Sequence, residues 1–215
     1  QLLTHTAGFP TDPACGILTQ NCKTTTAEQI EAAVAAGIPL YPPGANIQYS
    51  NFGYSLIGQL LAEHLGVGYE ALVNATVLGP LGMGDSSFDP SQIDAQAYFP
   101  NGAAIDSGDW GWANPAGGMV TSASDLAKIV KLLLRFDDAE PGLGLDSQTL
   151  WQMFTTQTDA NGPAELDFSL GMEVEFRPEG VVASKIGSQG FFFPTAPAFL
   201  ALGWTAYVSV MPNLR

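Results

Sequence analysis

The spacing of apolar residues predicts that the first two-thirds of the chain is mainly helical. In residues 121–136, apolar side chains recur at intervals of three and four, which places them on one face of a helix. Residues 46–66 predict a second amphipathic helix that ends at Gly66. The apolar face of this second helix is predicted to contain Leu56, Ile57, Leu60, Leu61 and Leu65.

Polar cap residues mark the start of two further helices. In residues 24–39, Thr25 is followed three positions later by Glu28, the spacing of a capping box. In residues 145–154, Asp146 is the predicted N-cap. These signals place the helix starts within a residue or two.

A short helix and a long irregular segment complete this part of the chain. The helix is predicted within residues 69–83 and should stop before Pro80, because proline disrupts a helix interior. Residues 84–118 are polar and rich in Gly, Pro and Asp. Trp110 and Trp112 in this segment either line a pocket or pin the segment to the core, and we favour the second interpretation.

The pattern changes after about residue 165, where alternating and β-branched stretches predict strands. The predicted strands are 168–176, 180–187 and 202–211. Because no long helix separates them, they should pair antiparallel. The expected fold class is therefore α+β: a single domain over 1–215, with a mainly helical part at 1–164 and antiparallel strands flanked by helices at 165–215.

Composition and charge exclude several functions. The chain has 215 residues, of which 46% are hydrophobic, enough for a sizeable core. Acidic residues number 21 against 7 basic ones, giving a net charge of -14. Such a surface repels nucleic acids and anionic membranes. No apolar run is long enough to span a membrane, so we expect a small-molecule or peptide partner.

Three weaker signals favour a secreted or extracellular protein. Cys15 and Cys22 either close a small disulfide loop or remain two free thiols. Their spacing does not form a zinc site, and no metal site is expected. Asn74 begins a glycosylation sequon, although it lies in a predicted helix. Acidic composition is the third signal.

The sequence Tyr49-Ser50-Asn51 at the start of the second helix allows two interpretations. In the structural one, Ser50 caps the helix and Tyr49 packs beside it. In the functional one, Tyr49 offers a phenol to a nucleophile and Asn51 offers an amide to a substrate carbonyl. A phenol has a pKa of about 10, so a basic role near neutral pH requires nearby positive charge.

Lys185 is the lysine best placed to supply that charge. Lys128 and Lys131 lie on the polar side of a predicted helix, where lysines are ordinary surface residues. Lys185 stands in an apolar predicted strand, where an unpaired charge is costly, and Gly187 and Gly190 follow it. These glycines would let a substrate lie close along the strand edge.

Several motifs resemble the serine β-lactamase and penicillin-binding-protein-like family, particularly its class C β-lactamase, esterase and D-peptidase branch. They are "LLTHTAG", "YSNFGYSLIGQLL", "GPLGMGDSSF", "AGGMVTSASDLAKIVKLLL" and "KIGSQG", in the family's order and approximate spacing. The resemblance covers residues 2 to about 205 and implies a β-lactamase/transpeptidase-like fold. His5, in the first motif, is expected to make a structural hydrogen bond at a helix terminus rather than transfer protons.

The resemblance assigns roles to the candidate residues. Tyr49 would move protons between a serine and the leaving group, and Asn51 would orient the substrate carbonyl. Lys185 would lower the pKa of Tyr49 and attract a substrate carboxylate. With Gly187 it matches the family's Lys-Thr-Gly strand motif, and the backbone N–H of Ser188 would stabilise an oxyanion.

The family's Ser-x-x-Lys nucleophile motif does not occur in this sequence. The positions three before each lysine hold Gln20, Asp125, Lys128 and Val182. In the family this motif lies upstream of the "LLTHTAG" segment, so we expect a fragment truncated at both ends. The expected function is part of a serine hydrolase that acts on an ester or amide through an acyl-enzyme, without cofactors. The alternative is a non-catalytic binding or structural module that retains the fold.

Overall fold

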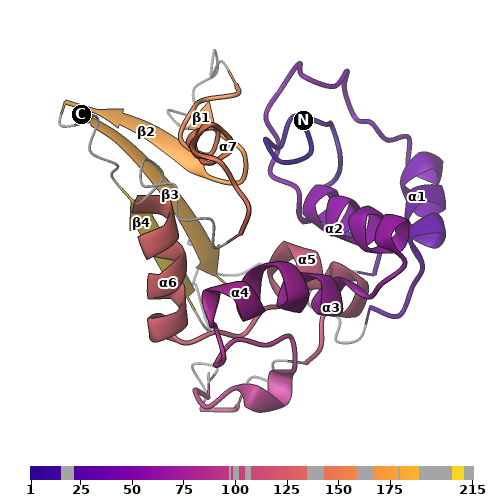
Figure 1. The fold of residues 1–215 in the computed structure, drawn as a ribbon. Coiled ribbons are helices and arrows are strands. Elements are labelled where there is room, and N and C mark those ends of the chain that lie inside the picture. Colours follow the sequence, from indigo (N-terminus) through magenta and orange to yellow (C-terminus); the bar gives the residue numbers. More distant parts are fainter. Residues whose placement is uncertain are drawn as a thin grey trace.

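The computed structural model describes residues 1–15, 22–96, 98, 102–104, 108–134, 143–158, 167–178, 180–188 and 205–210. Within these residues, a helical part and a four-stranded antiparallel sheet lie side by side (Figure 1). The N-terminal segment lies on the side of the helical part that is turned towards the sheet (Figure 1). The predicted α+β class is confirmed.

The described helices include four with ends close to the predicted ones and three short helices within residues 84–118, which were predicted to be irregular. They are α1 (Thr26–Ala35), α2 (Asn51–Leu65), α3 (Tyr69–Val73), η1 (Asn74–Leu78), α4 (Gly79–Leu81), η2 (Pro90–Gln92), η3 (Gly111–Ala113), α5 (Asn114–Gly117), α6 (Ala123–Leu134) and α7 (Ser147–Trp151). Thr25 and Glu28 form the predicted capping box of α1. Asp146 caps α7 by accepting a hydrogen bond from the backbone N–H of Thr149.

The buried face of α2 differs from the predicted one. Leu56 is buried, but Leu60, Leu61 and Leu65 are 43%, 51% and 56% exposed. The side of α2 that meets α5 carries small residues instead: a Cβ added to Gly58 would lie 2.4 Å from Pro115 Cβ. Such a close approach is possible only where the helix carries small side chains. This side of α2 is therefore buried in preference to the side with the larger leucines.

The third predicted helix continues past Pro80, contrary to expectation. The turn η1 is π-helical, and the Gly79 N–H bonds to the Asn74 carbonyl five residues earlier. Pro80 then lies in the first turn of α4, where a missing N–H costs no intrahelical bond. The helix ends at Gly82, whose φ of 66° is left-handed. The helix therefore accommodates Pro80 by forming a π-helical turn before it and beginning a new α-helical segment at Gly79.

The sheet has the order β1-β2-β3-β4, all antiparallel. Its strands are β1 (Asp167–Phe168), β2 (Glu173–Arg177), β3 (Gly180–Ser188) and β4 (Thr205–Val210). The predicted strand 168–176 is divided into β1 and β2 by a turn in which Gly171 has a φ of 89°. The prediction for 180–187 is confirmed by β3. The predicted strand 202–211 contains β4. The first three residues of that prediction, 202–204, and its last residue, 211, lie outside the described residues.

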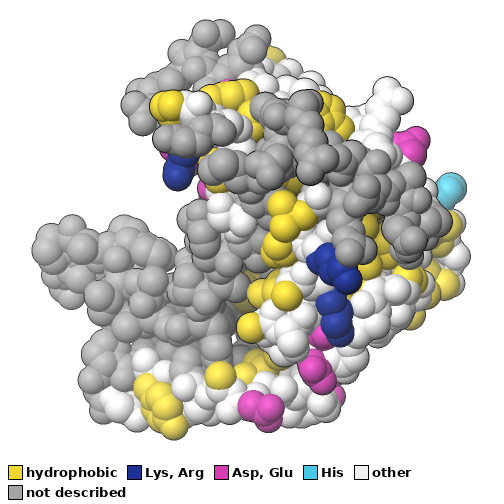
Figure 2. Space-filling view, turned by 60° about the vertical axis from the view of Figure 1, so that its left-hand side comes forward, with side chains coloured by type: hydrophobic (Ala, Val, Ile, Leu, Met, Phe, Trp, Pro, Cys, Tyr) yellow, Lys and Arg dark blue, Asp and Glu magenta, His cyan; other side chains and the backbone are white. Residues whose placement is uncertain are grey.

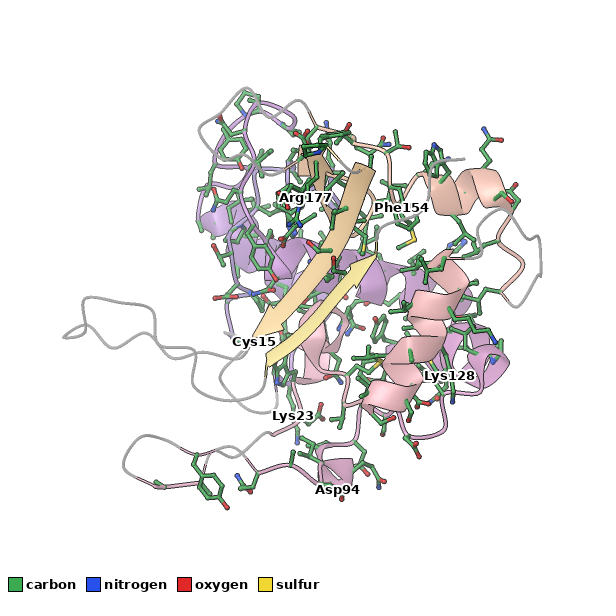
Figure 3. The ribbon with its side chains drawn as sticks, turned by 90° about the vertical axis from the view of Figure 1, so that its left-hand side faces the viewer. Cys15, Lys23, Asp94, Lys128, Phe154 and Arg177 are labelled. Carbon is green, nitrogen blue, oxygen red and sulfur yellow. A yellow bond between two sulfur atoms is a disulfide. The ribbon has the colours of Figure 1, made fainter. Side chains whose placement is uncertain are left out.

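Two apolar clusters hold these parts together. The first joins α1, α2 and the segment before α5 and contains Cys22, Ala33, Phe52, Leu56 and Trp112. The second joins α6 and the sheet and contains Leu133, Phe154, Met172 and Ala183. Phe154 comes from the chain just after α7 and lies in the space between the sheet and α6 (Figure 3).

Trp112 pins the long polar segment to the first cluster, which confirms the favoured interpretation for this residue, whereas Trp110 is not among the buried members of that cluster. Trp112 is 5% exposed, and its indole Nε1–H donates to Thr26 Oγ1 over 3.1 Å. Its backbone N–H donates to the Cys22 carbonyl over 3.0 Å. Cys22 and Cys15 form a disulfide, the first of the two predicted alternatives.

Lys128 is not the ordinary surface lysine that the sequence predicted. Its Nζ lies 2.7 Å from Oδ1 of Asp125, whose side chain is fully buried. The second oxygen of Asp125 accepts bonds from the Asp85 N–H and the Ser86 hydroxyl at 2.9 and 2.7 Å. Lys128 also donates to the Gly82 carbonyl. The pair therefore ties α6 to the chain after α4.

The charged surface and the helix lengths concern two predictions, that the chain binds no nucleic acid and that it contains no membrane-spanning helix. On the face drawn in Figure 2, the described basic side chains form no continuous stripe of the kind that follows a nucleic-acid backbone. Exclusion of nucleic acids remains a prediction from net charge. Among the described helices, none is both long and apolar enough to cross a membrane.

Candidate active site

Tyr49 is fixed in place by the start of α2. Ser50 is the N-cap, as the structural interpretation predicted, and its Oγ accepts from the Gly53 N–H over 2.9 Å. The same hydroxyl donates to the Pro10 carbonyl over 2.7 Å, so it ties the helix start to the N-terminal segment. Tyr49 is the residue before this cap and is 43% exposed. Its backbone is thus held while its side chain still faces an open region.

Lys185 approaches Tyr49 from the other half of the fold. Its Nζ lies 5.6 Å from the centroid of the Tyr49 ring and 5.2 Å from that of Tyr54. An ammonium over aromatic rings at these distances makes a cation–π contact. Lys185, which the sequence predicted as the cation near Tyr49, is therefore its neighbour although 136 positions separate the two by subtraction. Burial lowers the pKa of Lys185, and the charge of Glu173 opposes that effect.

The expected lowering of the Tyr49 pKa is wrong for the residues described. Partial burial, followed by the negative charges of Glu173 and Asp12, raises that pKa above its usual value. Each of these surroundings penalises the charged phenolate form of Tyr49. Tyr49 is consequently a neutral phenol at neutral pH and can donate a proton.

Asn51 is held by a neighbour rather than directed towards open space. Its Nδ2 donates to Asp12 Oδ1 over 2.8 Å, and its backbone N–H donates to the Thr11 carbonyl over 2.6 Å. The residue is 9% exposed. The amide nitrogen expected to contact a substrate carbonyl is therefore engaged with Asp12 in this structure.

Strand β3 presents an edge beside Tyr49. Its pairing with β2 ends where Ser184 faces Glu173, whereas its pairing with β4 continues to Ser188, which faces Thr205. Among the described strands, residues 185–188 thus have a partner on one side. Gly187 and Ser188 lie in this stretch, as the proposed strand motif requires, and Gly190 lies outside the described residues. A substrate could pair with the second side.

Three neighbours of the site were missed by sequence reasoning: Tyr54, Asp12 and Glu173. Tyr54 lies in the first turn of α2, so its place near the start of the same predicted helix was the local signal for it. Its phenol donates to the Leu3 carbonyl over 2.8 Å. Asp12 and Glu173 reach the site through tertiary packing, which no local pattern indicates.

His5 makes the predicted hydrogen bond at a helix terminus. Its Nδ1 accepts from the Ser50 N–H over 3.0 Å, and the side chain is 2% exposed. Burial, and secondarily the charge of Lys185, lowers the His5 pKa from 6.5 to about 4. His5 is therefore neutral at neutral pH, and Lys185 is the cation that faces Tyr49.

A separate cavity of about 420 Å³ lies near α3 and α5 and includes none of these residues. Glu70, Asp109 and Asn114 line it, and the Asn114 Nδ2 donates to both carboxylates at 2.8 and 3.2 Å. The acidic groups are thus bonded within the protein. Among the described residues, no three His, Cys, Asp or Glu side chains come together as a metal site.

The tyrosine at the start of α2 and the lysine of β3 thus lie side by side in an α+β fold. The family described as Beta-lactamase matches residues 1–213. The chain therefore belongs to the beta-lactamase family, and the resemblance found in the sequence is confirmed.

Named relatives agree with this assignment, and a solved structure shares the fold. "Putative beta-lactamase-like 1" of Homo sapiens is 38% identical over 98 residues, which cover 43% of this chain and 19% of that protein. A "Putative D-alanyl-D-alanine carboxypeptidase" of Salmonella heidelberg (strain SL476) is 27% identical over 207 residues, covering 80% and 46%. The structure of a class C beta-lactamase superposes with a TM-score of 0.72 and 22% identity, covering 98% of this chain and 60% of that one. The chain thus spans less than half the length of these two curated relatives.

Proposed function

We propose that this chain supplies the tyrosine, the strand lysine and the oxyanion donor of a serine hydrolase that cleaves an ester or amide through an acyl-enzyme. The nucleophilic serine would come from a Ser-x-x-Lys motif elsewhere in the same protein, because this sequence contains none. The observation that carries the proposal is the cation–π contact between Lys185 and Tyr49, which come from different halves of the fold. Membership of the beta-lactamase family supports it.

In the proposed acylation, the serine oxygen forms a bond to the substrate carbonyl carbon. The carbonyl electrons move to oxygen, which accepts a hydrogen bond from the backbone N–H of Ser188. When the tetrahedral intermediate collapses, the bond to the leaving group breaks, and Tyr49 gives that group its proton. The proton lost by the serine passes through the lysine of its own motif and restores Tyr49. Water then attacks the acyl-enzyme and releases the acid.

The protonation state of Tyr49 fits the donor role in this scheme. Because its pKa is raised, the phenol holds its proton at neutral pH. Use of Tyr49 as a base would require further positive charge, such as the lysine of the Ser-x-x-Lys motif. Asn51 would exchange its bond to Asp12 for one to the substrate carbonyl.

The proposed substrates are small esters or peptides with a free carboxylate. Lys185 is a half-buried cation beside the open edge of β3 and can attract that carboxylate. Ile186 replaces the hydroxyl residue usual in the family's strand motif, which favours substrates other than β-lactams. The Salmonella relative named a D-alanyl-D-alanine carboxypeptidase supports a peptide substrate. The Cys15–Cys22 disulfide and the exposed sequon at Asn74 favour a secreted protein.

The bond between Asn51 and Asp12 supports an alternative: a binding or structural module that retained the fold without the chemistry. Labelling separates the two proposals. A fluorophosphonate and a penicillin-type probe are applied to the full-length protein, to Tyr49→Phe and to Tyr69→Phe. Tyr69 is a matched control, because it packs on Phe88 away from the site and its phenol pKa is also raised by burial.

We expect the wild type and Tyr69→Phe to be labelled on one serine, and Tyr49→Phe to lose most of the labelling while remaining folded. Absence of labelling of the wild-type protein by either probe would support the non-catalytic alternative. Full labelling of Tyr49→Phe would remove the role assigned to that phenol.

A further inference from the structure

His5 holds the chain on both sides of Tyr49. Its backbone carbonyl accepts a hydrogen bond from the N–H of Gln48 over 2.8 Å. Its Nδ1 accepts one from the N–H of Ser50 over 3.0 Å. One residue thus binds the backbone N–H groups of the two residues that flank Tyr49 in sequence, and the side chain provides the second of these bonds.

The imidazole ring also packs against the site. Its centroid lies 4.6 Å from the Tyr49 ring with an interplanar angle of 35°, and 5.1 Å from the Tyr54 ring. On another side, the Phe168 ring meets it edge to face at 5.0 Å. His5 therefore fills the space between the start of α2 and the sheet, directly beneath the Tyr49 ring.

The hydrogen bond to Ser50 fixes the proton position on the imidazole. Because Nδ1 accepts, the neutral ring carries its proton on Nε2, which is buried and has no hydrogen-bond partner among the described residues. Protonation of Nδ1 would place two donors against each other and break the bond to Ser50. The titratable groups that face His5 are Tyr49, Tyr54 and Lys185, and the last of these disfavours a second positive charge.

The backbone of His5 is in a demanding conformation. Its φ is 57°, in the left-handed region, which is uncommon for residues other than Gly, although Asn, Asp and His adopt it more often than most. Such strain persists where the surroundings determine the conformation. Here the conformation is the one in which both the carbonyl and Nδ1 of His5 face the chain around Tyr49.

We propose that His5 is a positioning residue for Tyr49: by accepting hydrogen bonds from Gln48 and Ser50 and packing under the phenol ring, it sets the direction of the reacting hydroxyl. This inference rests on the proposed hydrolase function for its catalytic consequence. Its geometric part, the control of the Tyr49 ring by the Nδ1 acceptor, does not depend on it.

Two substitutions of similar polarity test the role of the acceptor. Asn places its Oδ1 where Nδ1 stands and tolerates a positive φ, so His5→Asn keeps the bond from Ser50. Gln places its amide one bond further out, so His5→Gln loses that bond. Both are made in the full-length protein, and folding is checked by circular dichroism and urea midpoint.

The first readout is the acylation rate with a fluorophosphonate, separated into probe affinity and maximal rate. We expect His5→Asn to stay within about threefold of the wild-type maximal rate and His5→Gln to lose at least about tenfold, with probe affinity unchanged, because misplacement of a reacting group lowers the chemical step. The second readout is the ¹³Cζ resonance of Tyr49 in tyrosine-labelled protein. It should match wild type in His5→Asn and shift in His5→Gln.

If His5→Gln fails to fold, the wild type and His5→Asn decide the question. In the wild type the Tyr49 resonance should move as the pH falls from 6 towards 4. In His5→Asn, which keeps the Glu173 and Asp12 carboxylates near Tyr49, the movement should be smaller by the part that the imidazole contributes. A Tyr49 resonance that behaves identically in both proteins over this range would overturn the inference, as would a folded His5→Gln with wild-type rate and resonance. Because the resonance needs no nucleophile, a wild-type protein that no probe labels would refute the proposed function and leave this result readable.

Discussion

Acidification should destabilise the fold through His5. The pKa of His5 is about 4 in the folded protein and 6.5 when the residue is exposed. Between these values the unfolded chain binds a proton that the folded chain excludes. The stabilisation is thus fully present above pH 6.5 and is lost as the pH falls towards 4.

The magnitude follows from the two pKa values. At pH 5 the unfolded imidazole is almost fully charged and the folded one almost fully neutral, so the free energy of unfolding should be about 2 kcal/mol lower than at pH 7. At pH 4 the loss should reach about 3 kcal/mol, close to the limit set by the gap between 6.5 and about 4.

The assay is urea unfolding of wild type and His5→Asn at pH 7, 6 and 5, followed by tryptophan fluorescence, to which the buried Trp112 contributes. Protonation of carboxylates with lowered pKa values, such as Asp146, also lowers the free energy of unfolding in acid. This effect should be equal in the two proteins, because both contain the same carboxylates. The difference between the two proteins therefore isolates His5. If their free energies of unfolding fall in parallel within about 0.5 kcal/mol, His5 titrates normally in the folded state, and the reasoning from burial is refuted.

Four further substitutions have expected outcomes that follow from the surroundings of single residues. Ser50→Ala removes the α2 cap and should lower the free energy of unfolding by about 1 to 2 kcal/mol. Ser55→Ala removes a buried hydroxyl with no partner among the described residues, so it should leave the free energy of unfolding unchanged or raise it. The urea midpoints of the two variants measure both effects. Gly111→Ala should lower the melting temperature, because its φ is 56° and the new Cβ would lie 2.7 Å from a backbone oxygen. Glu173→Gln should lower the phenol pKa of Tyr49, measured from its ¹³Cζ titration, because that carboxylate raises it; an unchanged or higher pKa would contradict the electrostatic account.

Local sequence patterns predicted the features that short stretches determine by themselves. The capping box at Thr25 and the N-caps at Ser50 and Asp146 depend on side chains within three residues of the groups that they bond. The strand that carries Lys185 could also be predicted from its apolar sequence, and the single lysine within it was unusual enough to indicate a functional residue. Family motifs then linked Lys185 to Tyr49, and the fold places them in contact.

Packing decided what the patterns could not. Two sides of α2 are apolar enough to be buried, and the close approach of Pro115 to Gly58 selects the one with small residues. The Tyr49 pKa rises chiefly because the phenol is partly buried, and secondarily because Glu173 and Asp12, 124 and 37 positions away by subtraction, add negative charge around it. The sequence alone indicated the cation near Tyr49, Lys185, but not the anions Glu173 and Asp12, because only the folded structure brings them close.

The central claim is that Tyr49, Lys185 and Ser188 surround the reacting atoms of a serine that another part of the protein supplies. A crystal structure of the full-length protein after reaction with a fluorophosphonate tests it most directly. We predict a phosphonylated serine from a Ser-x-x-Lys motif with its Oγ within about 3 Å of the Tyr49 hydroxyl, and a phosphonyl oxygen that accepts from the Ser188 N–H. A probe bound to a serine remote from Tyr49, with the β3 edge unoccupied, would contradict the account.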